Sequence, residues 1–128
     1  MIQVKPMENR EEENRLLAEA DAAEESRVLL MEDRGEKVGY VVVRLEGNTL
    51  HLHKLQAFGY DGSERPQGET LFILDTLMRS AASYGENNGA DWIVTDFPDF
   101  YDFFRARGFT IEDGFASTPM STIVRYEG

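Results

Sequence analysis

The chain has 128 residues, 41% of them hydrophobic, and this length and apolar content suit one domain with a substantial core. Its 13 basic and 24 acidic residues give a formal charge of −11, which opposes nonspecific binding to nucleic acid or to an anionic membrane. There is no cysteine, which excludes disulfides, thiolate metal ligands and a cysteine nucleophile.

The N-terminus and the apolar runs of the chain bear on the cellular location that we expect for it. No apolar run approaches the ~20 residues that span a bilayer, and the first six residues lack the apolar core of a signal peptide. We therefore expect a soluble, cytoplasmic protein that binds neither membrane nor nucleic acid. The acidic balance would suit a cationic substrate such as a polyamine or a lysine-bearing peptide, but it equally keeps an ordinary cytosolic protein soluble.

The first half of the chain predicts a strand, a helix and a three-strand meander. In chain order, the segments are a strand at 2–7, a helix at 8–23, and strands at 27–32, 38–45 and 49–57. The helix has an apolar stripe and early acidic residues that suit its N-terminus. We expect its charged side chains to face water; these are Glu11, Glu12, Glu13 and Arg15.

The third strand of the meander has an irregular pattern. Its apolar positions alternate through Leu50 and Leu52 and then shift by one, so that the next are Leu55 and Ala57. A shift of one residue near His53 is what a β-bulge produces.

The second half predicts helices and strands in alternation. In chain order, they are a loop at 59–67, a helix at 70–84, a strand at 91–97, a helix from Pro98 to about Arg107, and strands at 109–111 and 121–126. The long helix buries one apolar face, which consists of Ile73, Leu74, Leu77 and Ala81. The strand at 91–97 reads as buried, with Trp92 inside. A strand–helix–strand crossover makes 49–57 and 91–97 parallel, so we predict a mixed α/β architecture.

Two short motifs stand out in this half. Residues 65–70, Arg-Pro-Gln-Gly-Glu-Thr, form a glycine-containing turn that leads into a helix N-terminus, which is a favourable place for an anion. Residues 103–109, Phe-Phe-Arg-Ala-Arg-Gly-Phe, read as a helix end that Gly108 closes before the next strand begins.

These motifs and the order of elements resemble the GNAT superfamily of acyl-coenzyme A-dependent N-acyltransferases. The family's pyrophosphate loop has the form Arg/Gln-x-x-Gly-x-Gly/Ala, which this chain matches at Arg65 and Gly68, with Thr70 in the last place. The late Phe-Phe-x-x-x-Gly-Phe spacing also matches. The resemblance covers nearly the whole chain and implies a single GNAT-like domain over residues 1–128, with a mixed, mostly antiparallel twisted sheet flanked by helices.

The resemblance also implies a function. We expect an acetyl-coenzyme A-dependent N-acetyltransferase that moves the acyl group directly to a small-molecule or peptide amine, without a metal. In the family the bulged strand parts from its neighbour, and the pantetheine arm lies between them. The implied cofactor contacts are Leu55, Gln56, Ala57, Arg65, Gln67, Gly68, Glu69, Thr70 and Phe104.

Candidates for acid–base chemistry are few. His53 is a candidate base because an imidazole titrates near pH ~6.5, although it could equally belong to an ordinary polar strand face. The family's usual proton-donating Tyr is replaced by Phe104, and Tyr101 lies one helical turn before it as a candidate acid. The alternative is that these aromatic residues only pack together. A metal site built on His51 and His53 lacks an adjacent carboxylate.

A second hypothesis from another class stays open, namely a non-catalytic GNAT-like module that binds an acyl-coenzyme A or a protein partner. Phe104 has no proton to donate, Phe97 stands where the family often has Asn, and Glu69 puts an acid at the anion-binding helix start. One predicted helix stands where the family usually has two, so we expect an acceptor pocket that is either open or completed by another subunit, as in a homodimer.

Overall fold

The computed structural model describes residues 2–23, 25–61, 65–96 and 100–124. Its strands are β1 (Ile2–Pro6), β2 (Arg27–Asp33), β3 (Glu36–Glu46), β4 (Thr49–Ala57), β5 (Trp92–Thr95), β6 (Thr110–Glu112) and β7 (Phe115–Pro119). Its helices are α1 (Arg10–Glu19), α2 (Gly68–Asn87), α3 (Tyr101–Arg105) and α4 (Met120–Ile123).

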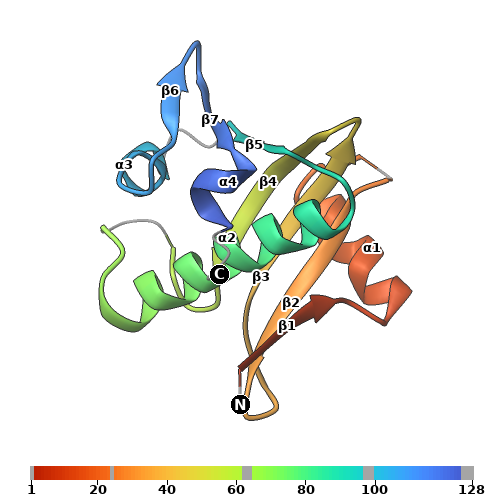
Figure 1. Ribbon diagram of the computed structural model, residues 1–128. Helices are drawn as coiled ribbons and strands as arrows, with labels where there is room; N and C mark the ends of the chain where they lie inside the picture. The colour runs from red at the N-terminus through yellow and green to blue at the C-terminus, as the bar shows by residue number, and fades with distance from the viewer. Residues whose placement is uncertain (1, 24, 62–64, 97–99, 125–128) are drawn as a thin grey trace.

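All seven strands join one sheet in the order β1-β2-β3-β4-β5-β7-β6, with α1 on one face and α2 across the other (Figure 1). Neighbouring strands are antiparallel except β4 and β5, which are parallel as the crossover predicted. The mixed, mostly antiparallel sheet flanked by helices confirms the predicted fold class.

Helix α2 is held by the larger of two apolar cores. Its predicted buried face is confirmed, with Leu74 and Leu77 fully buried against strands β2 to β5. Each such leucine contributes roughly 1.5–3 kcal/mol of burial free energy. The helix is longer than the predicted 70–84 because it begins at Gly68 and continues to Asn87, one turn past the predicted end.

Helix α1 covers the other face and is shorter than the predicted 8–23. Asn9 precedes it as the N-cap, and its side chain accepts a hydrogen bond of 3.0 Å from the backbone of Glu12. The helix ends before Asp21, whose φ of 53° cannot continue it. Leu17 packs into a second, smaller core with residues of β2 and β3.

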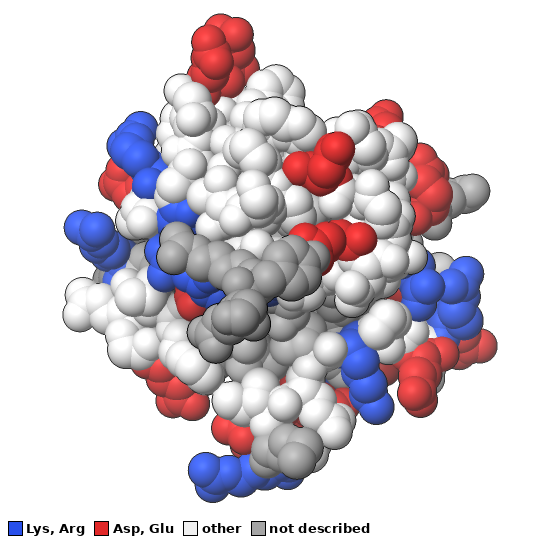
Figure 2. Space-filling model, viewed as in Figure 1, with Lys and Arg blue, Asp and Glu red and all other residues white. Residues whose placement is uncertain are grey.

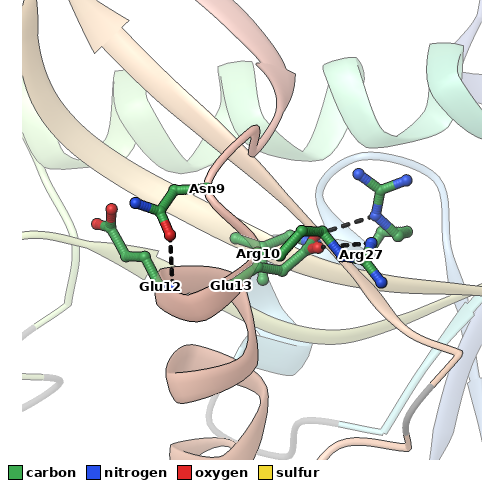
Figure 3. A network of polar contacts seen from close by, with 6 residues as sticks. Asn9, Arg10, Glu12, Glu13 and Arg27 are labelled. Atoms are coloured by element: carbon green, nitrogen blue, oxygen red, sulfur yellow. Dashed lines mark hydrogen bonds and ion pairs between the residues drawn. The ribbon is translucent and has the colours of Figure 1, made fainter.

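The prediction that Glu13 faces water was wrong, because its side chain is 1% exposed. One carboxylate oxygen accepts hydrogen bonds from Arg27 Nε at 3.0 Å and from the Val28 backbone N–H at 2.9 Å (Figure 3). The other oxygen accepts one from Arg10 at 3.3 Å. The physical reason is that Glu13 and Leu17 are four residues apart and so share the inward face of the helix.

The C-terminal part differs most from the prediction. The final strand predicted at 121–126 was wrong, since residues 120–123 form helix α4, while residues 125–128 lie outside the described part. The last strand is β7, which follows β6 through a turn at Asp113 and Gly114, both with positive φ. An Asp-Gly pair between two short strands is a hairpin signal, and the prediction of strands at 109–111 and 121–126 did not use it.

The segments around β5 are also shorter than predicted. Strand β5 covers only residues 92–95 of the predicted 91–97, and Trp92 is 44% exposed because strand alternation turns it away from buried Ile93. Helix α3 covers residues 101–105, and the predicted start at Pro98, like Phe97, lies outside the described residues. Gly108 closes the turn with a φ of 94°, as predicted.

Candidate functional site

The predicted bulge in β4 is confirmed. The register with β3 passes from Val42 opposite Lys54 to Val43 opposite Leu52, so His53 is the extra residue. Pairing between β4 and β5 runs from Thr49 only to Leu52, which lies opposite Thr95. Beyond this point β4 continues to Ala57 with a strand neighbour on the β3 side alone, among the residues that the structure describes. We call the place where β4 and β5 part the fork.

The free edge of β4 carries backbone hydrogen-bonding groups. The N–H of Phe58 donates to Val38 of β3 at 3.0 Å, so strand alternation turns the N–H groups of Leu55 and Ala57 away from β3. Gln56 has a different role, because its side-chain amide donates to the carbonyl oxygens of Ala57 at 2.8 Å and Tyr60 at 2.9 Å. It fixes the path of the chain as it leaves the strand.

The loop after β4 and the start of α2 surround a hollow of about 350 Å³. The residues that line it are Gly59, Tyr60, Asp61, Arg65, Pro66, Gln67 and Thr70. Gln67 is the N-cap of α2, and its side chain makes no cap hydrogen bond; the first turn of a helix carries backbone N–H groups that have no partner within the helix. Gly68 has a φ of 55°, which favours glycine there. The structure thus gathers Arg65, Gln67 and Thr70 around one hollow, with exposed Glu69 on the same helical turn.

Two histidines lie on the α1 face of β4, with ring centroids 6.3 Å apart. The Nε2 of His53 lies 2.7 Å from the carbonyl oxygen of Ala20 at the end of α1. Since a carbonyl only accepts, Nε2 donates in this contact, and in the neutral ring Nδ1 is then the acceptor. The candidate base is therefore held by α1, a contact that strand pattern alone could not reveal.

His51 was not singled out as a base, yet its surroundings shift its pKa. Burial lowers the pKa of the His51 imidazole, and the charge of Asp96 only partly opposes this. Arg44, which lies directly across from His51 in the sheet, lowers that pKa further. The register of the predicted hairpin would have placed Arg44 opposite His51, so the sequence could have indicated this effect on the pKa of His51.

The aromatic side chains of the motif at 103–109 pack against one another in the larger core. Phe104 is fully buried between the rings of Phe103 and Phe109, with centroids 5.3 and 4.9 Å away. The hydroxyl of Tyr101 donates a hydrogen bond to the carbonyl oxygen of Gly114 in the β6–β7 turn. The aromatic packing alternative is thus confirmed for the rings of Phe103 and Phe104, whereas the acid role of Tyr101 stays a prediction.

An ion pair that the sequence did not predict ties α2 to the end of α3. Arg107 Nε lies 2.6 Å from the Asp75 carboxylate, and its guanidinium lies 3.8 Å from the centroid of the Phe103 ring. Burial alone would raise the pKa of the Asp75 carboxyl, but hydrogen bonds from Arg107 and Arg79 hold it below its ordinary value. This ion pair therefore joins α2, which follows β4, to the segment just after α3, which follows β5.

On the face that Figure 2 shows, acidic and basic side chains are interspersed, and the basic ones form no continuous surface there. Among the described residues no group of three His, Cys, Asp or Glu side chains is placed to hold a metal ion. Within the same residues, no helix combines the length and the apolar character that crossing a membrane requires.

No protein-family model and no curated protein matches this sequence. Solved structures do match. An acetyltransferase of the GNAT family from Staphylococcus aureus Mu50 superposes with a TM-score of 0.64 at 16% identity, over 94% of this chain and 99% of that chain. The aminoglycoside 6'-N-acetyltransferase from Enterococcus faecium gives 0.66 at 14% identity, over 99% of both chains.

A third match has coenzyme A bound. The PaiA N-acetyltransferase from Thermoplasma acidophilum, solved in complex with coenzyme A, gives a TM-score of 0.60 at 14% identity, over 81% of this chain and 65% of that chain. This protein therefore has the fold of the GNAT acetyltransferases, which confirms the resemblance seen in the sequence. At identities of this size the likeness establishes the fold alone.

Proposed function

We propose that this protein is an acetyl-coenzyme A-dependent N-acetyltransferase that acts on a small-molecule or peptide amine. The observation that carries the proposal is the combination of a bulge at His53 and the end of β4–β5 pairing at Leu52, directly before the loop that leads into α2. Among the described residues, β4 then has an edge without a strand neighbour, and the loop after it leads to a helix start without a side-chain cap, which suits an extended ligand with a phosphate end.

The residues of the chain have distinct roles in this proposal. The N-terminus of α2 and Arg65 hold the pyrophosphate, with Gln67 and Thr70 beside it. The N–H groups of Leu55 and Ala57 bind the arm, and the N–H of Leu55, the nearer of the two to the bulge, meets the negative charge that develops on the thioester oxygen. The amine attacks the carbonyl carbon directly, the C–N bond forms, and the C–S bond breaks with its electron pair on sulfur.

The base that removes the amine proton is proposed as His53. Its Nδ1 is the ring acceptor, because Nε2 is engaged with Ala20. Tyr101 is proposed as the acid, on condition that its hydroxyl exchanges the Gly114 carbonyl for the leaving sulfur. An acceptor amine reaches this position from the α1 face of the sheet, where His51 and His53 lie. The cytoplasmic location and a homodimer that completes this face belong to the same proposal.

The second candidate function is a non-catalytic module that binds acyl-coenzyme A. The observation that favours it is the packing of the late motif, in which Phe104 is fully buried and the Tyr101 hydroxyl already has an acceptor. The two candidates share the cofactor site and differ only in the chemistry that follows binding.

A thermal-shift titration with acetyl-coenzyme A tests the shared site, because a ligand that binds only the folded state raises the melting temperature. We expect stabilisation at or below millimolar acetyl-coenzyme A, and no stabilisation would contradict both candidates. Release of free thiol across a panel of mono- and polyamines then separates them, since only the enzyme produces thiol in an amine-dependent manner.

A further inference from the structure

Thr95 is a buried hydroxyl at the vertex of the fork. It is the last residue of β5, lies opposite Leu52 of β4 on one side and Ala116 of β7 on the other, and has no exposed surface. Its Oγ1 finds no hydrogen-bond partner among the residues that the structure describes. Buried hydroxyls in folded proteins nearly always have a partner, so this one requires an explanation.

Within the described residues the fold gains no hydrogen bond from this hydroxyl. A valine has a similar shape and would fill the same space without an unpaired polar atom, and such replacements are often neutral or stabilising. A partner supplied from outside the chain accounts for a hydroxyl that the fold does not use.

The position of Thr95 indicates which part of a ligand would reach it. Its side chain is on the same face of the sheet as that of Ile93, two residues earlier, and Ile93 lies in the core with α2. The hollow at the start of α2 is at the other end of the fork, past Ala57. From Ala57 back to Leu52 the strand spans roughly 17 Å. An extended ligand anchored by phosphate at α2 and lying along β4 therefore brings its far end to Thr95.

On the basis of the proposed function, we propose that Thr95 Oγ1 donates a hydrogen bond to the sulfur atom of acyl-coenzyme A. The far end of that cofactor is the thioester. As the amine nitrogen bonds to the carbonyl carbon, the C–S bond breaks and its electron pair stays on sulfur. The proton lost by the amine goes to the base. The hydroxyl stabilises the thiolate without transferring its own proton, and it acts mainly in the transition state because a charged sulfur is the better acceptor.

This role differs from that of Tyr101, and it needs no acceptor amine to be tested. Coenzyme A and desulfo-coenzyme A differ only at the sulfur, so their affinities can be compared by calorimetry at pH 9, above the ~8.5 pKa of a free thiol. The wild type should bind coenzyme A roughly tenfold more tightly than desulfo-coenzyme A. Thr95→Val should bind both equally, and Thr95→Ser, which keeps a hydroxyl, should retain the preference.

The outcomes separate this inference from the function on which it rests. If Thr95→Val keeps the preference, or if the wild type binds both ligands equally, the contact with sulfur is wrong while the coenzyme A site stands. If the wild type binds neither ligand, the proposed function fails and the contact fails with it. Without ligand, Thr95→Val should melt at or above the wild-type temperature. Should it not fold, Thr95→Ala makes the same comparison.

Discussion

The two halves of β4 have the same local sequence character but different surroundings. The first half, Thr49–Leu52, is paired on both sides, and its Leu50 and Leu52 are fully buried. The second half begins at the bulged His53 and has β3 alone as a strand neighbour among the described residues. One extra residue thus divides the strand into a part that is paired on both sides and a part that has a strand neighbour on one side among the described residues.

The largest effect is expected in the first half. Leu50 packs on Gly85 of α2 so closely that a Cβ added there would lie 2.9 Å from Leu50 Cδ2. Leu50→Ala should lower the free energy of unfolding by about 3 kcal/mol in urea denaturation, because it leaves a cavity in the larger core. Acetyl-coenzyme A affinity of the folded variant should stay at the wild-type value, and a tenfold loss would show that the two halves are not separate.

The next effect concerns the loop that follows the second half. Arg65→Ala should weaken acetyl-coenzyme A binding about tenfold in a calorimetric titration, because a charged hydrogen bond to phosphate is removed, while the melting temperature without ligand stays unchanged. Arg15→Ala, which removes an exposed cation on α1, is the matched control and should bind normally. Equal affinity of both variants would remove Arg65 from the site.

The smallest effect concerns His51, two residues before the bulge. Because burial lowers the pKa of His51 in the folded state, the unfolded chain binds a proton more readily below the ordinary value of 6.5. The contribution of His51 to stability is therefore full above that pH and declines as the pH falls below it.

His51→Gln should remove this part of the pH dependence. Urea denaturation of both proteins at pH 7.5 and 5.5 measures it, and the wild type should lose more stability between the two values than the variant. The carboxylates contribute equally to both proteins, so the difference isolates His51. Identical losses would show that the imbalance in protonation is absent.

The meander, the parallel crossover and the bulge could be predicted because the spacing of apolar residues along the chain marks the strands, the helix between them and the shift within β4. Apolar alternation fixed the bounds of 49–57, and the shift after Leu52 located the extra residue at His53. The same reasoning failed for Glu13, whose carboxylate is buried by contacts with Arg27 and the Val28 backbone far along the chain. Its position four residues before Leu17 puts Glu13 on the inward face of α1, but the partners that stabilise its charge there lie far along the chain and have no local signature.

The candidate site was predicted unevenly for the same reason. Arg65, Gly68 and Thr70 follow from a local loop pattern, and the structure gathers Arg65 and Thr70 around one hollow. The hydrogen bond from Tyr101 to Gly114 depends on the β6–β7 hairpin, whose second strand was predicted at the wrong residues. The Thr95 hydroxyl, which has no hydrogen-bond partner among the described residues, lies where two strands stop pairing, and no residue pattern in β5 marks that point.

We propose that the second half of β4 and the start of α2 together hold acyl-coenzyme A. Backbone amide NMR during a titration with acetyl-coenzyme A tests this most directly. The amide resonances of Leu55, Ala57 and Gly68 are expected to move with a common binding curve. Resonances that stay fixed there, or that move only along the groove of about 480 Å³ between β1 and α2 near Val4 and Tyr84, would contradict it.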